Sequence, residues 1–261
     1  MTVRSSQESV RLSDGVAIPL IGFGTWQLDG DDAYNGVRAA LETGYRHIDT
    51  ATAYANEDKV GAAVRDSGVG RENVFITTKC PPGNAGREAE TLDASLHALG
   101  VDFVDLWLVH WPPNGEARPD TWKAFVQALE QGKTRAIGVS NYSLAQIDEL
   151  IDATGRAPAL NQIPWNPFAF NAREVAELQR RDVVLEGYSP LKRTDLGNPV
   201  LAEIAAAHRK TAAQVVLRWH VEHGFVVIPR SQRRERIEEN FAVFDFELTE
   251  EERRRLDALG A

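Results

Sequence analysis

The chain has 261 residues, 43% of them hydrophobic, and a formal net charge of -9 at pH 7. This acidic balance excludes a nucleic acid or an anionic membrane as the main partner, because neutralising phosphates requires a basic surface. The single cysteine, Cys80, excludes an intramolecular disulfide framework. Because no apolar run approaches the roughly 18 residues of a membrane span, the sequence predicts a soluble protein of the cytoplasm.

Short apolar runs alternate with longer segments of helical period, which is the pattern of repeated βα units and a parallel sheet. We expect strands near residues 21–23, 47–49, 74–78, 105–109, 136–139, 159–162, 183–188 and 225–228. Helical patterns lie between them, at 32–42, 57–66, 87–99, 121–131, 144–153, 173–181 and 212–222. Before the first strand, Asp14-Gly15 separates two short extended runs, as in a hairpin. The sequence predicts one (β/α)8 TIM barrel domain over residues 1–261, with an N-terminal β-hairpin capping its bottom.

Polar residues follow three successive apolar runs, in the stretches HIDTATAYANE, VFITTKC and VDLWLVHWP. They are Asp49, Tyr54, Lys79 and His110. A barrel brings the C-terminal ends of its strands together in one mouth. There the four side chains would form one acid-base cluster, which indicates chemistry on a carbonyl group.

Several stretches, in the order in which they occur, resemble the aldo-keto reductases. They are GFGTW at 22–26, GYRHIDTATAYANE at 44–57, ITTK at 76–79, LVHWP at 108–112, IGVSN at 137–141, NQI at 161–163, GYSPL at 187–191 and IPRSQRRERIEENFAVFDFEL at 228–248. The chain is most similar to the short bacterial members, such as the 2,5-diketo-gluconic acid reductases. The resemblance implies a (β/α)8 barrel that binds NADPH across its C-terminal mouth. A Rossmann domain is rejected, because GFGTWQ lacks the third glycine of that fingerprint.

The resemblance assigns Tyr54 the role of proton donor in NADPH-dependent reduction of an aldehyde or ketone to an alcohol. A free phenol has a pKa of about 10, and a lysine ammonium about 4 Å away would lower it by roughly three units. We therefore expect Lys79 to bring the pKa of Tyr54 close to neutrality. Asp49 resembles the family residue that keeps this lysine charged, and His110 would orient the carbonyl oxygen of the substrate.

The cofactor site is expected mainly in the last third of the chain. Arg230 and Ser231 follow the final strand at the start of a helix, where free N–H groups favour an anion. Arg236, Glu239 and Asn240 share one face of that helix. By resemblance, both arginines and Ser231 hold the adenosine 2'-phosphate, which would favour NADPH over NADH, while Glu239 and Asn240 contact adenine. The alternative is an exposed arginine-rich helix with internal ion pairs.

At the nicotinamide end, the resemblance places three residues around the carboxamide and one ring on the nicotinamide. These are Ser140, Asn141 and Gln162 for the carboxamide, and Tyr188 for the ring. Ser189, Leu191 and the backbone near Gly22 and Thr25 are candidates for the pyrophosphate and ribose.

For the substrate, Trp26 and Trp111 flank the acid-base cluster, and aromatic walls suit a mostly apolar pocket. The loops after His110 and Tyr188 are short, which predicts an open pocket for small aldehydes, dicarbonyls or keto sugars. Two stretches depart from the family pattern: Cys80 is followed by two prolines, and NQIPWNPF is expected to move Trp165 near the rim.

Two other classes of function remain open. A lyase or aldolase could use Lys79 as a Schiff base, although its amine would have to be neutral. A regulatory protein of the same fold could bind NADPH with little turnover. No metal site is expected, because His220 and His223 lack further ligands and are predicted to be surface residues. The family resemblance also implies a monomer.

Overall fold

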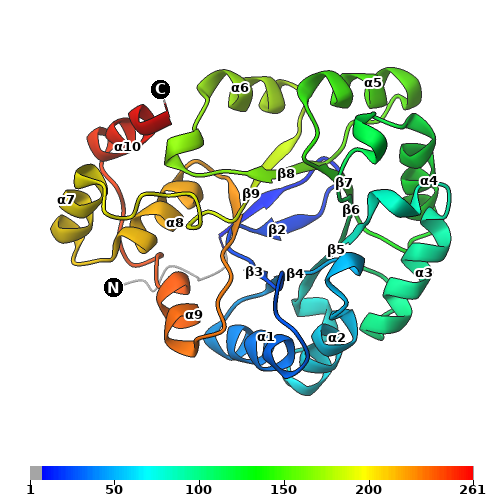
Figure 1. The fold of residues 1–261 in the computed structure, drawn as a ribbon, viewed down its shortest axis with the longest axis horizontal. Helices are drawn as coiled ribbons and strands as arrows, with labels where there is room; N and C mark the ends of the chain where they lie inside the picture. Colours follow the sequence, from blue (N-terminus) through cyan, green and yellow to red (C-terminus); the bar gives the residue numbers. More distant parts are fainter. Residues whose placement is uncertain (1–7, 261) are drawn as a thin grey trace.

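The computed structural model describes residues 8–260 and consists of a parallel β-barrel surrounded by helices (Figure 1). The barrel strands are β3 (Phe23–Gly24), β4 (His47–Asp49), β5 (Phe75–Cys80), β6 (Leu106–Val109), β7 (Ile137–Ser140), β8 (Leu160–Pro164), β9 (Val184–Tyr188) and β10 (Val226–Ile228). Neighbouring strands in this order pair in parallel. A further parallel bridge joins Ile21 to Val227, and the N–H of Gly22 donates to the carbonyl of Val227 at 2.9 Å, which closes the barrel. The predicted (β/α)8 fold is confirmed.

The helices lie outside the strands and screen them from solvent (Figure 1). They are α1 (Asp31–Thr43), α2 (Glu57–Asp66), α3 (Glu88–Leu99), α4 (Pro119–Glu130), α5 (Leu144–Thr154), α6 (Ala172–Arg180), α7 (Pro199–His208), α8 (Ala212–Glu222), α9 (Arg234–Phe241) and α10 (Glu250–Asp257). The short 3-10 turn η1 (Thr52–Tyr54) joins β4 to α2. The sequence analysis did not predict α7 and α10. The charged sequence of α10 buries only Leu256, so it has almost no apolar periodicity.

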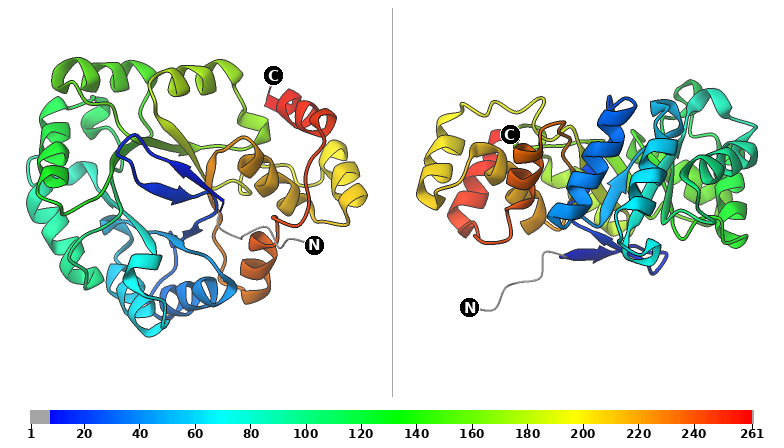
Figure 2. Two further views of the ribbon diagram at one scale, coloured as in Figure 1. Left: turned by 180° about the vertical axis from the view of Figure 1, so that it is seen from behind. Right: turned by 90° about the horizontal axis from the view of Figure 1, so that it is seen from below.

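The hairpin of β1 (Ser9–Arg11) and β2 (Ala17–Pro19) lies at one end of the barrel (Figure 2). The carboxylate of Asp14, in its turn, accepts a hydrogen bond from the N–H of Ile137 at 3.0 Å. Since Ile137 is the first residue of β7, the hairpin covers the N-terminal ends of the strands. The prediction of a bottom cap is confirmed, and the C-terminal mouth stays open.

Aromatic side chains fill much of the space between the strands and the helices. On β6, Trp107 stacks on Phe125 of α4, with ring centroids 3.6 Å apart and an interplanar angle of 6°. Side chains of this size bury about 150–250 Å² each, so such contacts contribute strongly to the stability of the barrel. No helix within residues 8–260 is long and apolar enough to cross a membrane.

Two expectations are wrong: that His220 and His223 are surface residues, and that Trp165 lies near the rim of the mouth. His220 is fully buried, its ring nitrogens lie 2.8 Å from the carbonyl of Val216 and 3.2 Å from that of Trp165, and burial lowers its pKa to about 4. His223 is half-buried and lies 2.9 Å from a carboxylate oxygen of Asp257. Trp165 packs edge-on against neighbouring aromatic rings and is 2% exposed, so it does not reach the rim. The packing of α8 against the barrel, which the local sequence does not reveal, buries these side chains.

Candidate active site

A cavity of about 650 Å³ opens at the C-terminal ends of the strands. Most of the residues that the sequence singles out line it: Trp26, Asp49, Tyr54, His110, Trp111, Ser140, Asn141, Gln162, Tyr188, Ser189, Leu191 and Arg230. They come from loops or strand ends that are far apart in the sequence. The barrel therefore brings the acid-base cluster, the aromatic walls and the expected nicotinamide residues into one site.

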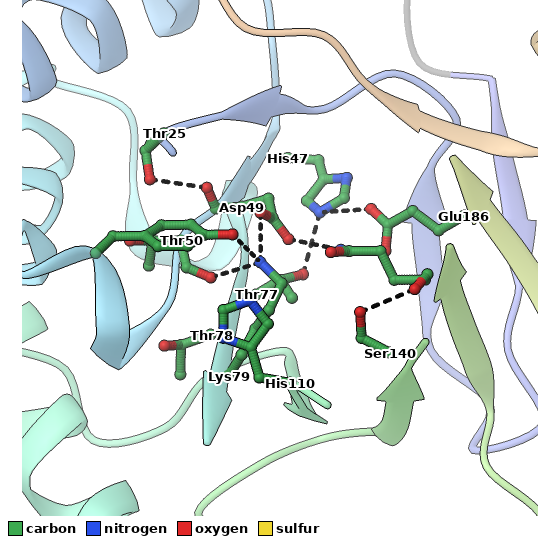
Figure 3. A network of polar contacts seen from close by, with 12 residues as sticks. Thr25, His47, Asp49, Thr50, Thr77, Thr78, Lys79, His110, Ser140 and Glu186 are labelled. Atoms are coloured by element: carbon green, nitrogen blue, oxygen red, sulfur yellow. Dashed lines mark hydrogen bonds and ion pairs between the residues drawn. The ribbon is translucent and has the colours of Figure 1, made fainter. Parts of the chain in front are cut away.

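Lys79 lies beneath this cavity and is fully buried on β5. Its ammonium donates to Asp49 Oδ1 at 2.6 Å and to the carbonyl of Thr50 at 2.8 Å, and it lies 3.4 Å from the Tyr54 hydroxyl (Figure 3). Burial is the largest single effect and favours the neutral amine, but the charge and hydrogen bond of Asp49 together with Tyr54 and Glu186 outweigh it, so the pKa of Lys79 is raised. Lys79 is therefore an ammonium at neutral pH.

The pKa of Tyr54 differs from the expectation. Burial raises it, and this effect exceeds the opposing effect of the Lys79 charge, while the nearby Asp49 carboxylate raises it further. The prediction of a pKa close to neutrality is wrong, because the estimate from the sequence included the lysine but not the loss of solvent around the phenol. Tyr54 is a protonated phenol at neutral pH, which is the form that can donate a proton.

His110 completes the acid-base cluster from the end of β6. Its ring lies edge-on to that of Tyr54, with centroids 5.6 Å apart. Burial, followed by the positive charge of Lys79, lowers the pKa of His110 to about 3. The imidazole is therefore neutral at pH 7, with one nitrogen as a donor and the other as an acceptor.

A buried network holds the turn that carries Tyr54. The hydroxyl of Thr52 donates to the carbonyl of Lys79 at 3.0 Å and lies 3.0 Å from the hydroxyl of Ser95 on α3. Ser95 in turn donates to the carboxylate of Glu57 at 3.1 Å. These contacts join the turn to β5 and fix the phenol relative to the lysine. The sequence analysis did not identify Glu57 or Ser95, because each is an ordinary helix residue until the elements are packed.

On the opposite wall, the residues expected around the carboxamide make contacts with one another. Asn141 donates from its amide to the carbonyl of His110 at 3.1 Å and to the Ser140 hydroxyl at 2.9 Å, and its oxygen accepts from Tyr188 at 2.9 Å. The Ser140 hydroxyl donates to the backbone carbonyl of Gln162 at 2.8 Å. The network fixes the ring of Tyr188 in the cavity wall.

Gln162 bridges two buried carboxyl groups. Its Nε2 lies 2.8 Å from Asp49 Oδ2 and 3.0 Å from Glu186 Oε2. Glu186, on β9, is fully buried, and its Oε1 lies 3.8 Å from Nε2 of His47, too far for a hydrogen bond. Burial, followed by the charge of Asp49, raises the pKa of Glu186 to about 8, and burial lowers that of His47 to about 3. Both groups are therefore neutral at pH 7 and do not form an ion pair. The sequence analysis missed Glu186, whose alternation with Tyr188 on one face of β9 was the available signal.

Two of the residues expected at the cofactor backbone lie outside the cavity. Gly22 lies lower in the barrel, where a Cβ would overlap the ring of His47. Thr25 is fully buried and its hydroxyl donates to the carbonyl of Asp49 at 3.0 Å. Gly24 lines the cavity instead. Gly22 and Thr25 thus flank β3 and do not offer groups to a ligand in the cavity.

The residues expected at the adenosine end lie on and before α9. Arg230 is exposed and donates to the side chain of Gln27 at 3.3 Å. Arg236 pairs with Glu239 at 2.7 Å, and the other oxygen of Glu239, Oε1, is buried and has no hydrogen-bond partner in the described part of the chain. Among the described residues, no side chain forms a capping hydrogen bond at the N-terminus of α9. Within residues 8–260 the Asn240 side chain has no hydrogen bond either. Ser231 donates to the backbone of Arg233 at 3.3 Å.

The cavity rim contains exposed aromatic and basic side chains. Trp26 and Trp111 are 42% and 48% exposed, which is high for such large apolar side chains. The ammonium of Lys192 lies 4.8 Å from the centroid of the Trp26 ring, and Arg193 lines the same wall. The sequence analysis missed both basic residues. Cys80, in contrast, is buried behind the cavity, and burial raises the pKa of its thiol to about 12.

Comparison with known proteins agrees with this geometry. The family described as Aldo/keto reductase family matches residues 20–261. The chain is 45% identical to an aldo-keto reductase of Mycolicibacterium smegmatis, over 92% of this chain and 89% of that protein. It is 40% identical to a glyoxal reductase of Bacillus subtilis, over 98% of this chain and 94% of that protein.

A solved structure, the aldo/keto reductase from Brucella melitensis, has the same fold. It superposes with a TM-score of 0.93 at 41% identity, covering 97% of this chain and 99% of that chain. The family match covers nearly the whole chain, and the solved structure shares both the barrel and a large part of the sequence. The chain belongs to the aldo/keto reductase family.

Proposed function

We propose that this protein reduces aldehydes or ketones to alcohols with NADPH, and that Tyr54 supplies the proton. The observation that carries the proposal is the cluster at the cavity, where the protonated Tyr54 hydroxyl lies 3.4 Å from the buried ammonium of Lys79. A Schiff-base role for Lys79 does not fit, because its raised pKa keeps the amine charged and not nucleophilic.

The residues present fit a nicotinamide dinucleotide. At one end, the side-chain oxygen of Gln162 has no hydrogen-bond partner among residues 8–260, and both Gln162 and the ring of Tyr188 line the cavity. At the other end, Glu239 has a buried oxygen that lacks a donor, as an adenine amino group would supply. Lys192, Arg193 and Arg230 provide positive charge for phosphates along the rim, although the chain as a whole is acidic.

When bound, NADPH would supply the hydride that no side chain can provide. As negative charge develops on the carbonyl oxygen, the Tyr54 hydroxyl donates its proton to that oxygen. The ammonium of Lys79 stabilises the resulting phenolate, and Asp49 keeps Lys79 charged and in place. The neutral His110 offers an N–H to the same oxygen and so orients the carbonyl.

For the substrate we propose small aldehydes, dicarbonyls or keto sugars. The cavity is open at its rim, where Trp26 and Trp111 are exposed. A relative that is 40% identical is named a glyoxal reductase, which agrees with a small dicarbonyl substrate. A monomeric state, a single domain over residues 1–261 and a cytoplasmic location stay predictions from the sequence.

The test compares Tyr54→Phe with a matched control, Tyr34→Phe, which removes a hydroxyl from a half-buried tyrosine of α1 that contacts Asp66. NADPH oxidation is followed with glyoxal, methylglyoxal, aromatic aldehydes and keto sugars. We expect Tyr54→Phe to bind NADPH normally and to lose most of its turnover, and Tyr34→Phe to retain both. Turnover by Tyr54→Phe equal to the unmodified protein would remove Tyr54 as the proton donor. Binding of NADPH by the unmodified protein without reduction of any carbonyl would favour the regulatory function.

A further inference from the structure

Gln162 has only one polar atom that is free to bind a ligand. Its Nε2 carries two N–H groups, and these point to Asp49 Oδ2 at 2.8 Å and Glu186 Oε2 at 3.0 Å. Its Oε1 has no hydrogen bond within residues 8–260, and the residue lines the cavity. The side chain therefore presents an acceptor to the cavity.

The opposite orientation of the amide is unfavourable. If the amide of Gln162 were flipped, its oxygen would face the carboxylate oxygen of Asp49, and two acceptors would meet there without a hydrogen between them. The assignment of nitrogen and oxygen follows from the hydrogen-bond network. Asp49 accounts for one N–H of the amide, and Glu186 accounts for the other.

The neighbouring polar groups already take part in hydrogen bonds with one another. The oxygen of Asn141 already accepts from Tyr188 at 2.9 Å. The Ser140 hydroxyl donates to the backbone of Gln162 and accepts from the amide of Asn141. Of the three side chains that the sequence places near a carboxamide, Gln162 is the one whose side-chain oxygen accepts no hydrogen bond from the described residues.

A packing role does not explain the carboxyl group of Glu186. It is fully buried in the barrel interior, its Oε1 has no hydrogen bond to any of residues 8–260, and Nε2 of His47 lies 3.8 Å from that oxygen (Figure 3). Burying a carboxyl group with an unused oxygen costs stability, and an apolar side chain would avoid that cost. The one side-chain hydrogen bond that Glu186 forms with the described residues joins it to Gln162. The function of Glu186 is therefore to be sought in what it does to Gln162.

We propose that Glu186 is a positioning residue: together with Asp49 it fixes the amide of Gln162, so that Oε1 faces the cavity and accepts a hydrogen bond from the carboxamide N–H of a nicotinamide cofactor. This inference rests on the proposed function. Glu186 does not touch the cofactor itself. It acts by holding the acceptor of Gln162 in one orientation.

The test measures binding of two dinucleotides to variants of Glu186, with quenching of tryptophan fluorescence as the readout. NADP+ carries the carboxamide, whereas its 3-acetylpyridine analogue carries an acetyl group that has no N–H. Glu186→Gln retains an acceptor for Gln162, and Glu186→Met removes it at similar size. Glu186→Leu replaces the methionine variant if that variant does not fold.

We expect Glu186→Met to weaken NADP+ binding by roughly 3- to 10-fold, the range for loss of one hydrogen bond, and to leave binding of the analogue unchanged. Glu186→Gln should bind both dinucleotides as the unmodified protein does. Because Glu186 acts through Gln162, Gln162→Leu should lose as much NADP+ affinity, and Gln162→Leu combined with Glu186→Met should lose no more than Gln162→Leu alone.

Equal losses for NADP+ and the analogue, or no loss for either, would overturn the inference and leave Glu186 as a packing residue. Additive losses in the double variant would also overturn it, because the two residues would then act independently. If the unmodified protein binds neither dinucleotide, the proposed function fails together with the inference. If the unmodified protein binds NADP+ and reduces carbonyls, but the Glu186 variants do not discriminate between NADP+ and the analogue, only the inference fails.

Discussion

Replacing Lys79 by methionine removes one buried charge beneath the cavity and leaves a side chain of similar length. The ammonium lies 3.4 Å from the Tyr54 hydroxyl. At an effective dielectric constant near 20, a charge at this distance stabilises the phenolate by about 5 kcal/mol, which corresponds to roughly three to four pKa units. If the transition state carries half or more of the phenolate charge, we expect the rate of the chemical step to fall about 10²- to 10³-fold.

The same substitution also affects stability, which has to be separated from the effect on the rate. Without Lys79, Asp49 becomes a buried carboxylate without a cation, which costs about 3–5 kcal/mol unless it takes up a proton. The double variant Lys79→Met/Asp49→Asn removes both charges. Its free energy of unfolding should therefore recover most of this loss, whereas its rate should not recover.

The assay is single-turnover oxidation of NADPH with saturating aldehyde, together with urea unfolding of both variants. A folded Lys79→Met variant that reacts within about tenfold of the unmodified protein would refute the reasoning, because the charge of Lys79 would then contribute little to the transition state. Recovery of the rate in the double variant would refute it too, since the loss would then come from the unpaired Asp49.

Three further outcomes follow from the structure. Arg236→Ala should weaken NADPH binding about tenfold or more and NADH binding far less, because a hydrogen bond to a charged phosphate is lost; equal losses in titrations would remove the phosphate from this residue. Between pH 4.5 and about 8 the folded state alone keeps the proton on Glu186, so its contribution to stability is lost as pH rises through about 8. As the pH rises from 6 to 9, the urea midpoint of Glu186→Gln should therefore increase relative to that of the unmodified protein. A difference between the two midpoints that does not change with pH would contradict the raised pKa of Glu186. Gly61→Ala should cost about 1–3 kcal/mol in urea unfolding, because its Cβ would overlap the carbonyl of Leu99; a more stable variant would show that α2 and α3 can separate.

Much of the fold could be predicted from local patterns. Apolar runs such as residues 74–78 and 105–109 indicate buried parallel strands, and the structure places β5 and β6 there. The helix at residues 57–66 matches α2, because its apolar face is regular. Local pattern failed where the apolar period is weak, as in the charged sequence of α10, and where burial depends on a distant element, as for His220.

Some residues of the candidate site could also be predicted from the sequence, and others could not. Residues that follow strand ends, such as Tyr54 and His110, could be placed in the mouth, because the fold brings all strand ends together. Glu186 and Lys192 could not be assigned, because neither matches a motif with a mechanism. Their surroundings, a buried amide in one case and an exposed indole in the other, exist only in the folded chain.

The sequence by itself determined the barrel, the order of its strands and the identity of the polar groups at its mouth, because periodicity and residue type are local properties. Only the tertiary structure decided the protonation states within that mouth. Tyr54 and Glu186 keep their protons and His110 remains neutral because burial removes water from each group. The extent of burial depends on side chains from several strands at once, and no local stretch of sequence contains that information.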